Sequence, residues 1–211
     1  MDGEFPPPPP DAFDPCFPMG VFLRGELVEL DSTLAAFRGV NGATLTLPGD
    51  PTPLVTTPPN GRLDTCVPPS EPLRFDVHAP TGFLGGSLVM PRDTLQSLRF
   101  LSFRSMTTAR AASFYSERGL AFDATKAHVL VFLSSDVTTV TLDRPHGAAQ
   151  AGNDGVQPGT FVWSASSTGR YVLFPNVDVS QPTGRVDAGP SLSVPLVAGE
   201  LTLAAISVVF L

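Results

Sequence analysis

Hydrophobic and polar positions alternate with the two-residue period of β-strands over much of this chain, most clearly in residues 73–79. There Leu73, Phe75 and Val77 fall on one face, and polar side chains fall on the other. Other short apolar or alternating runs are separated by turn signals at intervals of roughly 8 to 15 residues. This pattern predicts a mainly β protein, an antiparallel β-sandwich. The other expected strands are 21–30, 43–47, 83–90, 128–132, 137–142, 160–163, 170–174, 192–197 and 199–211.

The segment 199–211 is the most apolar part of the chain. Leu201 and Leu203 fall on odd-numbered positions, whereas Ile206, Val208 and Phe210, on even-numbered positions, lead the second half. This change of phase predicts either a bulge at Ala204 and Ala205 or a strand that is covered on both faces. We expect the segment to be a buried strand near a subunit contact.

Helix is expected only between Asp93 and Glu117. Asp93 or Thr94 can cap its start, and Gly119 is a natural stop. Residues 100–103 would also suit a strand. The pattern therefore predicts one short helical insertion without a fixed boundary.

Prolines divide the chain into a loop-rich front and a regular back. Sixteen of the 23 prolines lie in residues 1–80. We expect a Pro-rich N-terminal arm over 1–20, a loop-rich segment with short strands over 21–72, and the β-sandwich domain over 73–211. The arm contains five consecutive prolines and three phenylalanines, so it is either a disordered tail or an extended arm that docks on its own subunit or the next one.

Charge is scarce and mostly negative. Charged residues make up 16% of the chain, against about 25% in typical proteins, and the net charge is −7. This balance argues against a general nucleic-acid binder. Six basic and three acidic residues in 92–126 give one positive window. We interpret it as ordinary surface arginines, so nucleic-acid contact is unlikely except weakly through the Arg92 to Lys126 region.

The remaining composition points to a soluble protein. A surface with few charges suits burial against neighbouring subunits, although coding bias gives the same composition. Neither a signal peptide nor an apolar run of the roughly 20 residues needed to cross a membrane is recognised. We therefore expect a soluble protein made in the cytoplasm, with no membrane partner. Cys16 and Cys66 either form a bridge that ties down the N-terminal segment or remain reduced, and reduced thiols are the preferred interpretation.

No recognised motif that carries chemistry is found in the sequence. It has no G-x-S-x-G nucleophile elbow, no phosphate-binding G-x-x-x-x-G-K-[ST] loop and no H-E-x-x-H zinc motif. His78, His128 and His146 lie far apart and have no neighbouring ligand pattern. We therefore expect no enzyme activity and no catalytic, cofactor-binding or metal-binding residues.

Four aromatic residues near the C-terminus have two interpretations. They form either a binding platform or part of the sandwich core, and we expect at least two of them in the core. Strand alternation places the first two on one face of their strand. The four residues are Phe161, Trp163, Tyr171 and Phe174.

The order of these features resembles the coat proteins of small icosahedral viruses that have a single jelly-roll domain. The resemblance rests on the Pro-rich aromatic arm 5–18, the helical insertion 93–117, and the ending 170–176 through 194–210. It covers roughly residues 70–211. The tymovirus-like coats of this class also lack a basic arm, in keeping with the acidic balance here.

This resemblance implies a jelly-roll-like sandwich and a structural protein of a viral capsid or capsid-like particle. Such a protein would self-assemble with identical or related subunits in a virion made in the host cytoplasm. It would act either in the main shell or as an outer capsid-associated protein. The alternative is a receptor- or glycan-binding sandwich, fibre-head or lectin-like, with loops near Asn153 and Gly184 as its contact surface.

Overall fold

A computed structural model of the 211-residue chain describes residues 16, 20–33, 35–68, 71–91, 93–94, 100–134, 138–154 and 161–207. Sixteen strands and the helix α2 (Thr108–Ser116) account for most of the regular structure in these residues, so the expectation of a mainly β sandwich is confirmed. The strands are β1 (Val21–Leu23), β2 (Gly25–Glu29), β3 (Thr44–Thr46), β4 (Pro53–Thr56), β5 (Thr65–Val67), β6 (Leu73–His78), β7 (Gly86–Met90), β8 (Leu101–Ser105), β9 (Ala127–Leu133), β10 (Thr141–Leu142), β11 (Gln150–Asp154), β12 (Phe161–Ala165), β13 (Tyr171–Val177), β14 (Thr183–Asp187), β15 (Ser191–Pro195) and β16 (Leu201–Ile206).

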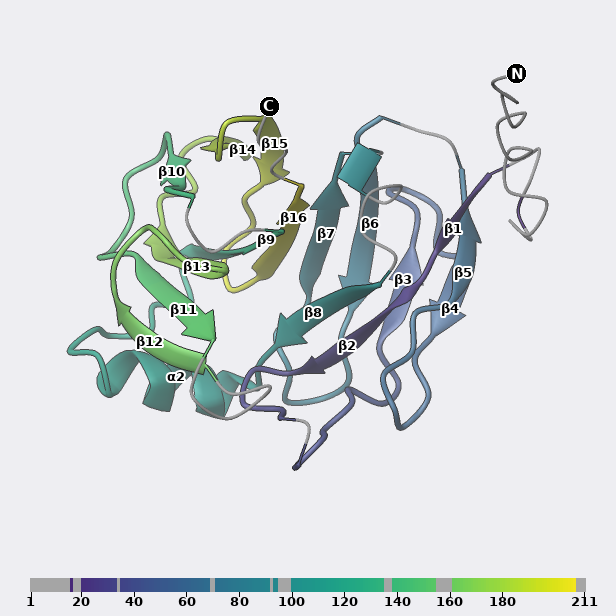
Figure 1. The fold of residues 1–211 in the computed structure, drawn as a ribbon, viewed down its shortest axis with the longest axis horizontal. Helices are drawn as coiled ribbons and strands as arrows, with labels where there is room; N and C mark the ends of the chain where they lie inside the picture. The colour runs from purple at the N-terminus through teal and green to yellow at the C-terminus, as the bar shows by residue number, and fades with distance from the viewer. Residues whose placement is uncertain are drawn as a thin grey trace, which may run out of the picture.

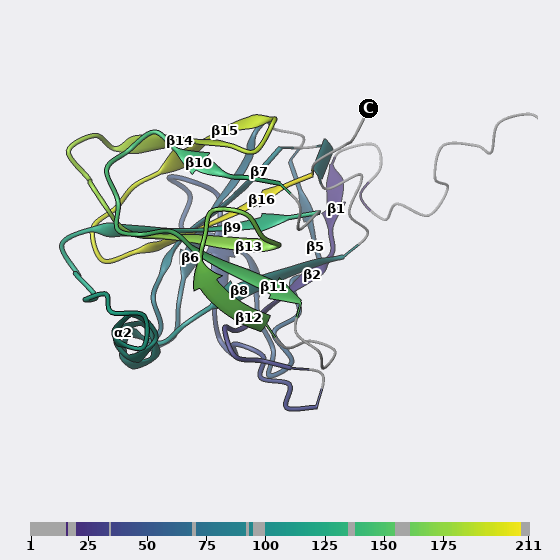
Figure 2. The same cartoon turned by 60° about the vertical axis from the view of Figure 1, so that its left-hand side comes forward.

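A nine-stranded sheet organises the molecule. Its order is β12-β11-β13-β9-β16-β7-β6-β3-β4. The pairs β1-β5 and β2-β8 form two small sheets, and β10, β14 and β15 form a third. Figure 1 shows β2 and β8 crossing in front of β7 and β6, while β10, β14 and β15 lie over the opposite half of the molecule. Figure 2 shows these three strands stacked above β9 and β13.

The large sheet buries apolar side chains on both faces. One face packs against β1, β2, β5, β8 and α2, and this core contains Leu27, Phe75 and Phe114. The other face packs against the three-stranded sheet, in a core that contains Phe174 and Val194. In a sheet covered on both faces, the strands are apolar at nearly every position. Strand β9 is an example, since all seven of its residues are buried.

The C-terminal strand β16 lies at the centre of this sheet. All six of its residues are buried. Leu201 and Leu203 face the first core, whereas Ala204 and Ile206 face the second. Its pairing with β9 runs without a register shift from Leu201 to Ile206. The change of phase in the sequence therefore reflects a strand covered on both faces and not a bulge.

The strand β16 also accounts for the main departure from the expected antiparallel pattern. It runs parallel to both β7 and β9, and β2 runs parallel to β8, while the other nine strand pairs of the described residues are antiparallel. Parallel neighbours need long connections. Here β8 and α2 lie between β7 and β9 in the sequence. In the sheet, β16 lies between β7 and β9.

The N-terminal part of the chain is integrated into the same fold. Strands β3 and β4 extend the nine-stranded sheet beyond β6, and β2 pairs with β8. Residues 21–72 therefore share a core with residues 73–207, and the division drawn at Leu73 is not a boundary in the fold.

The helical insertion is shorter than the sequence suggested. Residues 101–105 form strand β8, so the part of the expected 93–117 helix that spans them is corrected to strand. Leu101 and Phe103 alternate into the first core, and pairing of β8 with β2 satisfies the backbone of this segment. Asp93 and Thr94 are helical, and α2 occupies Thr108–Ser116.

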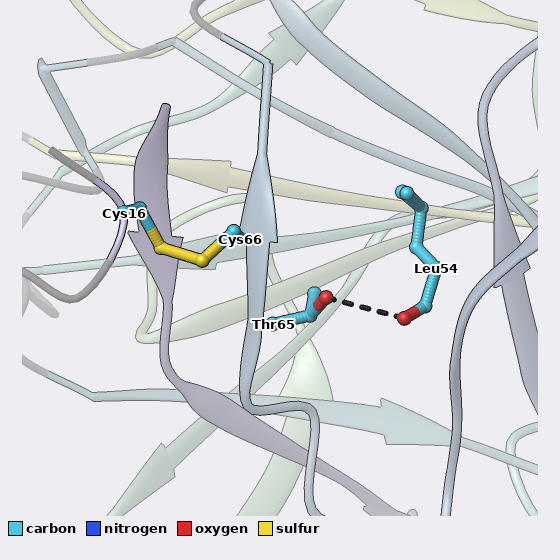
Figure 3. The surroundings of a disulfide bond; sticks show 4 residues. All are labelled: Cys16, Leu54, Thr65 and Cys66. Atoms are coloured by element: carbon cyan, nitrogen blue, oxygen red, sulfur yellow. Dashed lines mark hydrogen bonds between the residues drawn. A yellow bond between two sulfur atoms is a disulfide. The ribbon is translucent and has the colours of Figure 1, made fainter. Parts of the chain in front are cut away.

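Cys16 and Cys66 form a disulfide, so the preference for reduced thiols is corrected. Antiparallel pairing of β1 with β5 places Phe22 opposite Cys66 and brings Cys16 within reach. Figure 3 shows the bond beside Thr65, whose hydroxyl donates to the carbonyl of Leu54 in β4 at 3.2 Å. The disulfide thus links the N-terminal segment to β5. Strand β5 is joined in turn to β4, at an edge of the large sheet.

The proline run and the three phenylalanines of the expected arm lie outside the described residues. Only Cys16 and Gly20 are described in 1–20, and 208–211 also lie outside. Among the described residues, no helix has both the length and the apolar character needed to cross a membrane.

Candidate functional site

A pocket of about 260 Å³ opens between three elements that are distant in the sequence. The turn after β2 contributes residues 31–33, α2 and its C-terminal end contribute Arg110 and Arg118, and β12 contributes Phe161 and Trp163. Figure 1 shows α2 passing below β11 and β12. We call this cavity the arginine–tryptophan pocket.

The start of α2 and the turn that follows it place Arg110 and Arg118 at the pocket. The Thr107 hydroxyl caps the helix by accepting the backbone N–H of Arg110 at 3.0 Å. Helical spacing then aligns Arg110, Phe114 and Arg118 along one side. Gly119, with a φ of +69°, closes the helix just after Arg118.

The guanidinium of Arg110 is fully engaged within the protein. Its Nε and Nη2 donate to the two carboxylate oxygens of Asp31, and its Nη1 donates to Glu117 at 2.8 Å. The hydrogen bonds that Arg110 donates to Asp31 raise the pKa of Arg110, and the one that it donates to Glu117 lowers the pKa of Glu117. Arg110 therefore holds Asp31 in a fixed orientation in the pocket and has little left to offer a ligand.

Arg118 differs because part of its guanidinium is not used. The group stacks on the Phe114 ring, 3.5 Å from the centroid, and Nη1 donates to the Phe114 carbonyl at 2.8 Å and to Glu117 at 3.2 Å. Its buried Nε has no hydrogen-bond partner among the described residues. An unpaired donor of this kind costs about 1 to 3 kcal/mol. The hydrogen bonds of its guanidinium to described residues both use Nη1, so Nη2 is the part that can donate to a ligand in the pocket.

Trp163 forms the aromatic wall and is held from two sides. It packs edge-on against Phe114, with centroids 5.1 Å apart. It also lies opposite Gly152 of β11, where an added Cβ would come within 2.9 Å of the indole ring. Glycine at position 152 therefore allows the indole to lie close to the backbone, and the ring stays partly exposed to the pocket.

Arg104 supports the pocket from behind. Only 7% of the residue is exposed, and its Nη1 donates to the carbonyls of Leu30 and Ser32 at 2.9 Å. Its guanidinium also lies 4.3 Å from the centroid of the Phe161 ring. Arg104 therefore fixes both the turn that carries Asp31 and one of the aromatic walls.

A second polar cluster, Tyr115 with His128, is fully buried between α2 and β9. The His128 Nδ1 lies 2.8 Å from the Tyr115 hydroxyl and accepts the backbone N–H of Asn176 at 3.3 Å. The proton of the neutral ring therefore lies on Nε2, which has no partner in the described part of the chain. Phe122 stacks on the ring at 4.7 Å. Burial lowers the pKa of His128 to about 4 and raises that of Tyr115. With both groups enclosed, the cluster has a structural role.

This burial predicts a loss of stability in acid. The unfolded chain binds a proton at His128 near pH 6.5, whereas the folded chain binds it only near pH 4. The contribution is therefore present above pH 6.5 and is lost as the pH falls toward 4, by about 3 kcal/mol. Urea unfolding at pH 7, 5.5 and 4 measures it. His128→Gln should show a smaller decline than the parent, and His78→Gln, on the exposed face of β6, should not. Equal declines in all three proteins would contradict the prediction.

A larger cavity of about 490 Å³ lies between β10 and the β11-β12 end of the large sheet. Alanine, serine and apolar side chains make up most of its lining. Its titratable member is His146, whose Nδ1 lies 2.6 Å from the Gly147 carbonyl and whose ring packs on Phe174. It holds no charged pair comparable to Arg110 and Asp31, so the arginine–tryptophan pocket is the better candidate site.

The four aromatic residues divide between the two roles that the sequence left open. Tyr171 and Phe174 are buried in the two opposite cores, as expected for at least two of the four. Phe161 and Trp163 share one face of β12 and line the pocket. Two of the four residues therefore belong to the cores, and the other two line the pocket.

The three arginines of the pocket region were not predicted as a site. The sequence interpretation took the positive window as ordinary surface charge, which is wrong for the buried Arg104, whereas Arg110 and Arg118 are partly exposed and line the pocket. The excess of arginine in 92–126 was the available signal. Asp31, which pairs with Arg110, lies 79 residues before it in the sequence.

The other residues singled out in the sequence are not brought together. Asn153 lies in β11 and its side chain accepts the backbone N–H of Arg170, while Gly184 lies in β14 of the three-stranded sheet. They are strand residues in two different sheets, and residues 155–160, which follow β11, lie outside the described residues. His78 meets Thr46 at 3.1 Å. Within the described ranges, no group of three or more His, Cys, Asp and Glu residues is placed to hold a metal ion.

No model of a protein family matches the sequence, and no curated protein matches it significantly.

Proposed function

We propose that this protein is a recognition module, a β-sandwich that binds a small ligand in the arginine–tryptophan pocket and catalyses no reaction. The observation that carries the proposal is that Arg118 lines the same cavity as Trp163 while its Nη2 donates to no described residue. A ligand acceptor would satisfy this donor, and the indole would cover an apolar part of the ligand. Pockets that combine an apolar wall with a few convergent polar groups are typical ligand sites.

The polar side chains at the pocket support binding over catalysis. The Ser32 and Thr33 hydroxyls accept backbone N–H groups of Arg38 and Ala36. Asp31 is held by two hydrogen bonds from Arg110. None of these hydroxyls has a general base within hydrogen-bond reach among the described residues, which an activated nucleophile requires.

We also propose that the protein acts in an oxidising compartment, in place of the expected cytoplasmic location. The disulfide between Cys16 and Cys66 supports this, because such bonds persist in secreted, periplasmic and extracellular proteins and are rare in the cytosol.

Trp163 makes binding directly measurable, because it is the only tryptophan of the chain. A ligand in the pocket should shift or quench its emission. Arg118→Gln should weaken binding by roughly tenfold or more, because a charge-assisted hydrogen bond is lost. Arg185→Gln is the matched control, since Arg185 lies on β14 and pairs there with Asp187. Fluorescence titration with a panel of small sugars, organic acids and nucleosides tests the proposal. If no panel member responds in the parent, or if Arg118→Gln binds as well as the parent, the proposal fails.

The second candidate function is self-assembly, as in a viral capsid or capsid-like particle. Exposed large apolar side chains favour it, namely Phe37, Phe100, Val162 and Val197. Val162 lies on β12, an edge strand of the large sheet. Unpaired edges readily add strands from another chain. Particle mass in dilute solution tests this candidate: large symmetric oligomers support it, and a stable monomer at micromolar concentration rules it out.

A further inference from the structure

We infer that the ligand of the arginine–tryptophan pocket is a carboxylated sugar, a hexuronate unit of an acidic glycan. The inference rests on the proposed binding function and adds the class of ligand. Three properties of the pocket carry it: one unsatisfied positive group, a fixed carboxylate that accepts hydroxyl protons, and an aromatic wall.

The charges around the pocket leave a place for one negative charge. Arg104, Arg110 and Arg118 supply three positive charges, and Asp31 and Glu117 supply two negative ones, so the net charge is +1. Arg110 pairs with both acidic residues, and Arg118 shares Glu117 through Nη1 and keeps Nη2 free of hydrogen bonds to described residues. A carboxylate matches the planar edge of a guanidinium. A phosphate group, with a charge of about −1.5 to −2, would exceed the available positive charge and lie near Asp31.

The fixed carboxylate of Asp31 selects for hydroxyl groups. Arg110 occupies one site on each of its oxygens, and an ionised carboxylate offers about four acceptor sites. The other acceptor sites of the Asp31 carboxylate, which lines the pocket, would need donors from the ligand. A ligand without donors, such as an aromatic acid, would bury these acceptors unpaired, at a cost of about 1 to 3 kcal/mol per group. Sugar hydroxyls satisfy them.

The aromatic wall and the size of the pocket fit one sugar ring. Trp163 is braced by Gly152 and Phe114 and keeps part of its indole exposed, so it offers a rigid apolar surface to the C–H groups of a ring. The volume of about 260 Å³ falls just below the range of roughly 300 to 1,000 Å³ for drug-sized ligands. One monosaccharide unit therefore enters, and the rest of a glycan would extend into solvent.

Titration of the full chain with five probes, followed by Trp163 emission, tests the inference. The probes are methyl glucuronoside, methyl galacturonoside, methyl glucoside, benzoate and inorganic phosphate. At least one uronoside should bind roughly tenfold or more tightly than methyl glucoside, benzoate or phosphate. Arg118→Gln should remove the preference for the uronoside over the glucoside, and Asp31→Asn should weaken both sugars. Arg185→Gln should behave as the parent.

The outcomes separate the ligand class from the binding function. Equal or tighter binding of benzoate or phosphate overturns the acidic-sugar inference, and it leaves the pocket as a binding site. Binding of methyl glucoside as tight as that of the uronosides does the same. Absence of any response to the two uronosides overturns the inference, while the wider panel decides the binding function. Circular dichroism of each variant shows whether a loss of binding comes from a loss of fold.

Discussion

Leu203→Asp is expected to leave the chain without a stable fold. Leu203 lies in β16, is 4% exposed and faces the first core, and its strand holds β7 and β9 together. An unpaired carboxylate at this position has no partner in the core, so it must be protonated or left buried at a cost of several kcal/mol. Small domains are stable by only about 5 to 15 kcal/mol. The variant should show little cooperative unfolding in urea when followed by circular dichroism.

A milder substitution and a matched edge substitution complete this experiment. Leu203→Ala should remain folded and lose about 2 to 5 kcal/mol in urea unfolding, because it leaves a cavity. Val162→Asp introduces the same charge on β12, where the side chain is 63% exposed, and should change stability by less than about 1 kcal/mol. A Leu203→Asp protein that unfolds cooperatively at the parent's urea midpoint would show that β16 is not central to stability.

Loss of the disulfide is expected to cost about 4 kcal/mol. Cys16 and Cys66 are separated by 50 residues, and a bond that closes a loop of this length restricts the unfolded chain by about this amount in the chain-entropy model. It also fastens the segment before β1 to β5. The double variant Cys16→Ser with Cys66→Ser should therefore unfold at a lower urea concentration than the oxidised parent.

Reduction provides an independent measure of the same effect. Dithiothreitol should shift the parent to the midpoint of the double variant and should leave the double variant unchanged. If the oxidised parent and the double variant unfold at the same urea concentration, the bond does not contribute to stability, and its support for an oxidising compartment is weakened.

The fold class was predictable because it depends on local pattern. Leu73, Phe75 and Val77 alternate in the sequence and face the first core in the structure. The change of phase between Leu203 and Ile206 left two interpretations, a bulge or a strand covered on both faces, and the structure shows the second. The boundary of the helix was less predictable, because Leu101 and Phe103 suit either a helix or a strand. Pairing of β8 with β2 makes this segment a strand.

The candidate site was much less predictable, since it is assembled from distant parts of the chain. Phe161 and Trp163 were recognised as a pair on one face, and that followed from strand alternation alone. Their combination with Arg118 depends on α2 packing against β12, with Phe114 and Trp163 in contact. The engagement of Arg110 by Asp31 joins residues 79 apart in sequence.

The sequence by itself determined the β character of the protein, the burial of its last strand and the alternating faces of its strands. These properties follow from the two-residue period and the distribution of apolar side chains. The tertiary structure alone decided that β16 runs parallel between β7 and β9, that Cys16 is bonded to Cys66, and that Arg118 faces a pocket with Trp163. Each of these depends on which distant segments become neighbours. The local pattern of apolar and polar residues does not specify those neighbours.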